Sequence, residues 1–418
     1  MPFFIDPQLT GRGRLQVDAL ALTITTPLEN ATVRVMKGGG ETAILEEMLT
    51  DSSGQSPIIE LPAPPVEFSQ YPSEQMPYSE YDITVTAPGF EKIVVEGVQI
   101  LPDTLSYQDC FLSPVTAAGG QVEIIHIDEH TLWGNFPPKI PEEEVKELPP
   151  STGLVVLPEV VIPEFIIVHL GRPDDRSARN IWISFPDYIK NVASSEIYAT
   201  WPEQTIRANV LAIISLTLNR VFTEWYRNQG YDFHITNSTA FDQAFVPGRN
   251  IFEEISRIVD DIFKDYIARP NARQPLFAQY CDGQRVSCPN WMRQWESRDL
   301  GEKGFFTLDI LRHFYGFNIY LRQAQQVEGV PRSFPGTPLQ VGSIGPDVRR
   351  IQEQLNMVST HYPAIPRIRV DGVFDEETRA SVQKFQSIFR LSSDGIVGSA
   401  TWHRLAHIYV AVTRMAEL

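Results

Sequence analysis

The stretch FPDYIKNVASSEIYATWPE, residues 185–203, decides how the central part of this chain folds. Apolar residues at helical spacing in its first half predict one helix. Thr200 and Glu203 have the spacing of a capping box, and Pro202 between them suits a first helical turn, so we expect Thr200 to cap a second helix. Apolar residues recur near the helical period over 206–225, which predicts that this second helix is long and buried.

Glu196 lies at the break between these two predicted helices. The small residues Ala193, Ser194 and Ser195 precede it and leave space around its side chain. A carboxyl group in a tight, partly apolar turn can have its pKa raised enough to donate a proton near neutral pH. Most carboxylates are surface groups, however, so spacing alone favours a solvated glutamate near a helix end.

The same stretch resembles the signature of the stage II sporulation protein D family, in which Tyr-Ile, Val and Glu precede Trp-Pro and an Ala-rich helix. Members of that family are lytic transglycosylases that cut the glycan strands of peptidoglycan. The resemblance implies that Glu196 is the catalytic acid and base. We expect its neighbours Ser195 and Trp201 to contact the substrate.

Two further segments match that family's pattern. They are Asp242-Gln-Ala-Phe245 and Gln279-Tyr280-Cys281. The resemblance implies that both line the glycan groove, with Asp242, Gln243 and Tyr280 binding or orienting sugar.

Cys281 and Cys288 leave a choice open. Their spacing is wider than that of zinc-ribbon pairs, and no histidine lies between them. A disulfide or two plain thiols is the favoured interpretation, and we expect no cofactor and no metal. Because some relatives carry zinc, a structural zinc shared with His169 or His234 stays an alternative.

The acidic charge is concentrated in the first third of the chain. The 418 residues have a formal net charge of −17, and residues 1–164 hold 25 acidic and 7 basic side chains, a balance of −18. No segment has the basic excess that nucleic-acid binding needs. No apolar run approaches the length of a membrane span, and the first residues show no ordinary secretion signal.

The predicted organisation is multidomain. Alternating apolar residues between turn-forming residues predict a small antiparallel all-β sandwich within residues 1–135, which resembles transthyretin-like and carboxypeptidase-regulatory-like modules. Prolines and glutamates then predict an extended, exposed linker over 136–164, either a processing site or a passive spacer. A mixed α+β catalytic domain is predicted over 165–325 and a second linker over 326–338.

Residues 339–418 carry the most specific motif. Asp371-Gly372 and Asp394-Gly395 each end one segment, and Thr378 and Thr401 then begin the next helix. This pattern closely resembles the all-α, three-helix peptidoglycan-binding domain of many wall hydrolases, so peptidoglycan is the expected partner.

The order of these segments resembles the SleC-type spore cortex-lytic enzymes. That resemblance implies an inactive precursor, a zymogen, whose first part is a propiece removed by a subtilisin-like germination protease, and a location in the spore cortex or coat region. Two other functions stay open: an N-acetylmuramoyl amidase, and a non-catalytic wall-binding or spore protein. An amidase of this kind usually needs a zinc cluster of histidine and carboxylate, which the sequence does not supply.

Overall fold

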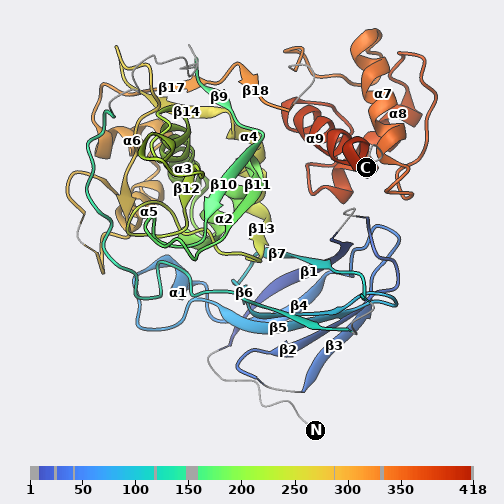
Figure 1. The fold of residues 1–418 in the computed structure, drawn as a ribbon, viewed down its shortest axis with the longest axis horizontal. Coiled ribbons are helices and arrows are strands. Elements are labelled where there is room, and N and C mark those ends of the chain that lie inside the picture. Colours follow the sequence, from blue (N-terminus) through green and yellow to red (C-terminus); the bar gives the residue numbers. More distant parts are fainter. Residues whose placement is uncertain are drawn as a thin grey trace.

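A computed structural model describes residues 9–22, 26–40, 43–116, 120–146, 159–286, 288–329 and 334–415 (Figure 1). Buried hydrophobic residues form three large clusters within these ranges. One gathers mainly residues 160–324, one residues 15–127 with Val246, and one residues 339–412. No helix in the described ranges is long and apolar enough to cross a membrane.

The first part of the chain forms two sheets that share one core. The four-stranded sheet has the order β13-β7-β1-β4, and the five-stranded sheet has the order β3-β2-β5-β6-β8. Their strands are β1 (Gly11–Ala21), β2 (Thr32–Lys37), β3 (Ile44–Leu49), β4 (Ile59–Ala63), β5 (Ser79–Thr86), β6 (Lys92–Ile100), β7 (Leu105–Leu112), β8 (Val122–His126) and β13 (Ile251–Phe252).

The purely antiparallel sandwich predicted for this part is wrong in two places. β1 pairs with β7 in parallel, and β6 pairs with β8 in parallel. In addition, β13 joins the first sheet from a distant part of the chain, where Ile251 pairs with Tyr107. Crossovers of this kind depend on long-range pairing, which local alternation does not specify.

The described part of the middle region contains nine short strands, five α-helices and the 3-10 helix η1 (Arg227–Gln229). The α-helices are α2 (Phe185–Glu196), α3 (Glu203–Phe222), α4 (Glu253–Ile262), α5 (Gln294–Glu302) and α6 (Thr307–Tyr315). The strands outside the N-terminal sheets are β9 (Val161–Ile162), β10 (Phe165–His169), β11 (Asn180–Ser184), β12 (Ile235–Thr236), β14 (Asp265–Ala268), β15 (Tyr280–Cys281), β16 (Met292–Arg293), β17 (Tyr320–Gln323) and β18 (Gln326–Val327). A short helix α1 (Glu67–Gln70) lies in the Pro-rich insertion between β4 and β5.

Helix α2 begins and ends where its sequence directs. The Ser184 hydroxyl accepts a hydrogen bond from the Asp187 amide, and Pro186 occupies the first turn. Ile197 then takes an extended backbone, so Glu196 is the last helical residue. The capping box predicted for α3 is wrong, because its N-cap is Pro202 and no side chain caps it.

The linker predicted over 136–164 is exposed only in part within residues 139–146, where Ile140, Pro141, Glu143 and Val145 are exposed and the other side chains are partly or fully buried. This segment has no helix or strand, yet Lys146 is buried and the main chain bonds to the middle region at Ala240, Gln274 and Gln279. Proline content excluded regular structure here, but it did not reveal that the segment is packed. The predicted processing site falls partly on residues 147–158, which lie outside the described ranges.

The last part of the chain is helical, as predicted. It consists of α7 (Pro346–Val358), α8 (Glu376–Ile388) and α9 (Ser399–Met415), whose buried faces form one core. Arg390 ties this part to the N-terminal sheets through ion pairs with Asp18 at 2.8 Å and Asp109 at 2.6 Å.

Candidate functional site

Glu196 ends α2 with its side chain buried, at 3 % exposure. Its Oε1 atom accepts a hydrogen bond from the Ala244 amide at 2.8 Å. Its Oε2 atom is buried and has no partner at hydrogen-bond distance in the described part of the chain, although the Tyr280 hydroxyl is near enough to stabilise the carboxylate. Because buried polar atoms are almost always paired, an unpaired carboxylate oxygen indicates a group kept free for a ligand or a reaction.

Burial raises the pKa of Glu196 above its ordinary value. The Lys139 ammonium, the Tyr280 hydroxyl and the Ala244 amide act in the opposite direction, since each stabilises the charged carboxylate. The net shift favours the protonated form, as a general acid near neutral pH requires.

A pocket of about 130 Å³ opens beside this carboxyl group. Tyr280, Gln294, Thr239 and Arg285 line it together with Glu196. Cys281, Asp282 and Val286 also line it. The segment before the predicted catalytic domain supplies the other lining residues: Thr131, Gly134, Asn135, Phe136, Pro137 and Lys139.

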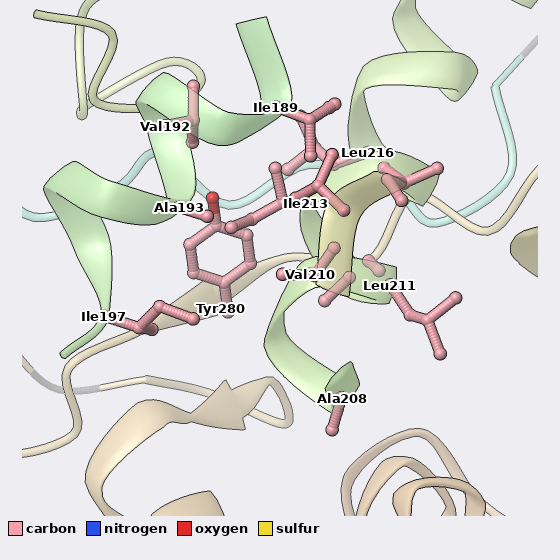
Figure 2. Packing of buried hydrophobic residues seen from close by; sticks show 14 of the residues in the cluster. Ile189, Val192, Ala193, Ile197, Ala208, Val210, Leu211, Ile213, Leu216 and Tyr280 are labelled. Atoms are coloured by element: carbon pink, nitrogen blue, oxygen red, sulfur yellow. The ribbon is translucent and has the colours of Figure 1, made fainter. Parts of the chain in front are cut away.

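Tyr280 belongs to the site, and Gln243 positions it. The Tyr280 hydroxyl accepts a hydrogen bond from Gln243 Nε2 at 3.1 Å, and the ring packs in the cluster that holds Ala193 and Ile197 (Figure 2). Gln243 is fully buried, and its Oε1 accepts bonds from Tyr188 and Thr217. With both ends of its amide occupied, Gln243 orients Tyr280 and does not reach the pocket.

Asp242 is also fully buried, and its carboxylate is occupied by protein groups. One oxygen takes the Arg220 guanidinium at 2.7 Å, and the other takes the Tyr226 hydroxyl and both the amide and hydroxyl of Thr236. The structure therefore gives this carboxylate a positioning role, whereas the family resemblance implied contact with sugar.

Ser195 and Trp201 lie in the interior and outside the pocket lining. The Ser195 hydroxyl donates to the Asn191 carbonyl within α2. The Trp201 indole donates to the Ser69 carbonyl and packs against Tyr198 and Trp295. Both side chains stabilise the turn after Glu196 from the protein interior, on the side away from the pocket.

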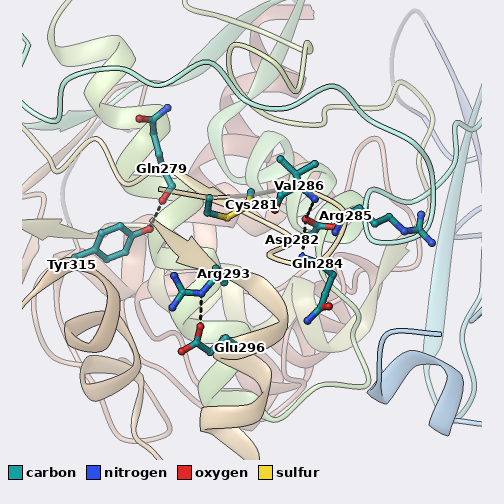
Figure 3. The surroundings of a disulfide bond; sticks show 10 residues. Gln279, Cys281, Asp282, Gln284, Arg285, Val286, Arg293, Glu296 and Tyr315 are labelled. Carbon is teal, nitrogen blue, oxygen red and sulfur yellow. Dashed lines mark hydrogen bonds and ion pairs between the residues drawn. A yellow bond between two sulfur atoms is a disulfide. The ribbon is translucent and has the colours of Figure 1, made fainter. Parts of the chain in front are cut away.

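A disulfide joins Cys281 to Cys288, with 6.0 Å between their Cα atoms. It closes a loop in which the Asp282 carboxylate accepts the amides of Arg285 and Val286 (Figure 3). This loop places the Arg285 side chain at the pocket, where it donates to the Gly134 carbonyl. Within the described residues, no group of three or more histidine, cysteine, aspartate and glutamate side chains could hold a metal ion.

Sequence reasoning missed Lys139, Arg285 and Gln294. Gln294 donates to the Glu196 carbonyl at 3.1 Å and so fixes the end of α2. One feature of the sequence could have pointed to Lys139: it is one of only two basic residues in the otherwise acidic predicted linker.

Residues 344–405 match the family model described as a putative peptidoglycan binding domain. The zinc D-Ala-D-Ala carboxypeptidase of Streptomyces albus G is 38 % identical over 68 residues, which is 16 % of this chain and 25 % of that protein. The chain thus spans about a quarter of the length of this curated relative. These matches support peptidoglycan as a partner and a function connected with the cell wall.

Two solved structures are also similar over short stretches. The SleB N-terminal domain shares 33 % identity over 18 % of this chain and 93 % of that one, with a TM-score of 0.15. The minor pilin GBS52 of Streptococcus agalactiae shares 13 % identity over 26 % and 46 %, with a TM-score of 0.18. Scores this low carry no argument about the present fold.

Proposed function

We propose that this chain is a peptidoglycan lytic transglycosylase that cleaves the bond from N-acetylmuramic acid to N-acetylglucosamine in spore cortex. One observation carries the proposal: the buried Glu196 lines a pocket and has a raised pKa, with one carboxyl oxygen held by the Ala244 amide and the other without a hydrogen-bond partner among the described residues. The peptidoglycan-binding match at 344–405 supports the choice of substrate.

The proposed reaction uses one carboxyl group twice. Protonated Glu196 donates its proton to the oxygen that leaves with N-acetylglucosamine, while the muramoyl ring acquires oxocarbenium character. The resulting carboxylate then removes the proton from the muramoyl C6 hydroxyl, whose oxygen attacks C1 and closes a 1,6-anhydro ring. Glu196 ends the cycle protonated, and water is not consumed.

No second carboxylate has to act as a nucleophile, unlike in most glycosidases. The environment of Asp242 supports this scheme, because its oxygens are already occupied by Arg220, Tyr226 and Thr236. Glu196 lines the pocket, and one of its carboxyl oxygens has no hydrogen-bond partner among the described residues.

The proposal also includes synthesis as a zymogen, cleavage near residues 147–158 by a subtilisin-like germination protease, and a location in the spore cortex or coat region. The charge distribution supports a removable first part, since the excess of acidic residues ends at residue 164.

Mass spectrometry of cortex digested with the linker-cleaved protein tests this function. We expect anhydro-muramoyl ends on the released fragments. Reducing muramic ends alone would identify a hydrolase, and free stem peptides would identify an amidase. Wall binding without any released fragment would identify a non-catalytic binding protein.

A further inference from the structure

The segment Lys139–Lys146 follows the surface of the middle region from Glu196 toward Arg220. Its main chain is held as an extended ligand would be held. The Ile140 amide donates to the Ala240 carbonyl at 2.7 Å, and two glutamines each bond the segment from both ends of their amides. Gln279 bonds Glu142 and Ile140, and Gln274 bonds the amide and carbonyl of Lys146.

Lys139 places a positive charge at the pocket of Glu196. Its ammonium lies 4.5 Å from the centre of the Tyr280 ring and donates to the Asp242 carbonyl. Lys139 and Glu196 line the same pocket and interact electrostatically. In the proposed reaction, the muramoyl ring beside Glu196 becomes positively charged in the transition state. The Lys139 ammonium therefore has the same charge as this oxocarbenium-like ring.

Glu142 places a negative charge on Arg220. The guanidinium donates Nη1 to one Glu142 oxygen at 2.9 Å and Nη2 to the other at 2.6 Å, a bidentate pair. Arg220 is fully covered while this pair exists, and its Nε remains bound to Asp242. If the segment leaves, two Nη donors lose this carboxylate, which is unfavourable unless another anion replaces it.

We propose that the segment Lys139–Lys146 occupies part of the substrate groove as an internal ligand, next to the pocket at Glu196, and that Arg220 is a subsite for a carboxylate of the substrate, which Glu142 occupies in the uncut chain. The inference rests on the proposed function and adds to it an acidic substrate group and a means of regulation. The Lys139 ammonium lowers the pKa of Glu196. Departure of the segment would remove this charge, so the Glu196 carboxyl group would hold its proton more strongly in the exposed site.

The first test measures whether the segment covers Glu196, independently of catalysis. The uncut chain is compared with Lys139→Met/Glu142→Gln and with Glu143→Gln, a control at an exposed glutamate of the same segment. Each protein is treated with a carbodiimide and glycine ethyl ester, and labelling of Glu196 is located by mass spectrometry. We expect labelling at least tenfold faster in the double variant than in the uncut wild type and the control.

The double variant could react faster because it is misfolded. The control for this is a chain with the wild-type segment and a specific protease site inserted between residues 147 and 158. Cutting it should also accelerate labelling of Glu196. If the double variant keeps its melting temperature and Glu196 reacts no faster in it or in the cut chain, the internal-ligand proposal is overturned.

The second test addresses the Arg220 subsite. Isothermal titration of the double variant with N-acetylmuramic acid, which has a free carboxylate, is compared with titration with N-acetylglucosamine, which has none. We expect at least tenfold tighter binding of the acidic sugar, and none by the uncut wild type. Equal binding of both sugars overturns the subsite. Faster labelling without any glycan cleavage supports the internal ligand while it contradicts the lytic function.

Discussion

At the scale of single residues, Glu196 combines two properties that rarely occur together in a carboxyl group. It is buried among protein atoms, which disfavours its charge, and one of its oxygens has no partner among the described residues. Burial without full pairing destabilises a fold, so such a group is expected where function requires it. The Ala244 amide holds the other oxygen and sets the direction of the free one.

Glu196→Gln should abolish lysis and preserve wall binding. The amide has nearly the same shape and still accepts the Ala244 hydrogen bond, but it cannot donate and recover a proton. We expect the release of anhydro-muramoyl ends to fall by roughly 10²–10⁴-fold, measured on cortex by mass spectrometry. A sedimentation assay with intact peptidoglycan is the control for binding. An unchanged rate would favour an amidase.

Tyr280→Phe should shift the pH dependence of activity. The Tyr280 hydroxyl lowers the pKa of Glu196, so its removal raises that pKa further. A general acid must be protonated, and its activity is lost as pH rises through its pKa. The descending alkaline limb of kcat/KM should therefore move to higher pH. Tyr320→Phe, at an exposed tyrosine, should leave the limb in place.

At the scale of elements, the site depends on the contact between α2 and the loop 244–246. Asn191 of α2 donates to the Val246 carbonyl at 2.8 Å and accepts from the Val246 amide at 2.9 Å. The same loop supplies the Ala244 amide to Glu196. One helix thus carries both the catalytic candidate and the residue that holds its hydrogen-bond donor in place.

Asn191→Ala should destabilise the fold by about 1–3 kcal/mol, because it leaves the buried Val246 amide unpaired. It also removes one of the two hydrogen bonds to the Val246 carbonyl, which keeps the bond from the Arg249 amide. Urea unfolding measures the change. Asn228→Ala, which removes one bond of an exposed side chain to the Thr223 carbonyl, is the control and should cost less than half as much. Equal losses would contradict the role given to the Asn191 amide.

Helix α9 should make stability depend on pH. Burial lowers the pKa of His403 to about 4, and Lys264 acts in the same direction, while the Ser399 carbonyl opposes it. Between pH 6.5 and 4 the unfolded chain therefore binds more protons at this residue than the folded chain does, so stability falls as pH falls. From pH 7 to 5 the loss should be on the order of 2 kcal/mol. His403→Gln should reduce this pH dependence in thermal unfolding.

At the scale of the whole molecule, segments far apart in the sequence hold the N-terminal sheets, the middle region and the C-terminal helices together. β13 extends an N-terminal sheet from the middle of the chain, and Gln99 and Asn250 exchange two hydrogen bonds beside it. Arg390 lies over the Tyr107 ring between two aspartates of the N-terminal sheets. The first part of the chain thus contacts both other parts (Figure 1).

Arg390→Gln should loosen the C-terminal helices from the N-terminal sheets. The variant removes both ion pairs and leaves the buried Asp18 without its counter-charge, a loss of about 3 kcal/mol. We expect a larger radius of gyration in X-ray scattering of the uncut chain. Arg379→Gln, at an exposed pair with Glu376, should leave it unchanged. An unchanged radius in Arg390→Gln would show that other contacts hold this part.

Local patterns in the sequence determined several features of this protein. The break after Glu196, the largely buried α3 and the C-terminal Asp-Gly and Thr pattern were all predictable, and the family match at 344–405 confirms the last. Each of these depends on residues close together in the chain, where helical period, caps and turns act directly on the backbone. The predicted domain boundaries and the role of Glu196 stay predictions.

Only the tertiary structure decided what surrounds Glu196. It buried Asp242 and Gln243 among protein partners, paired Cys281 with Cys288, and laid Lys139 and Glu142 over the site. These arrangements join residues from 7 positions apart (Cys281 and Cys288) to 141 positions apart (280 − 139, Lys139 and Tyr280), and no local preference of the backbone encodes which of them meet. These contacts form because pairing charged groups and amides in a shared interior lowers the free energy of the fold. This stabilisation exists only once the interior has formed.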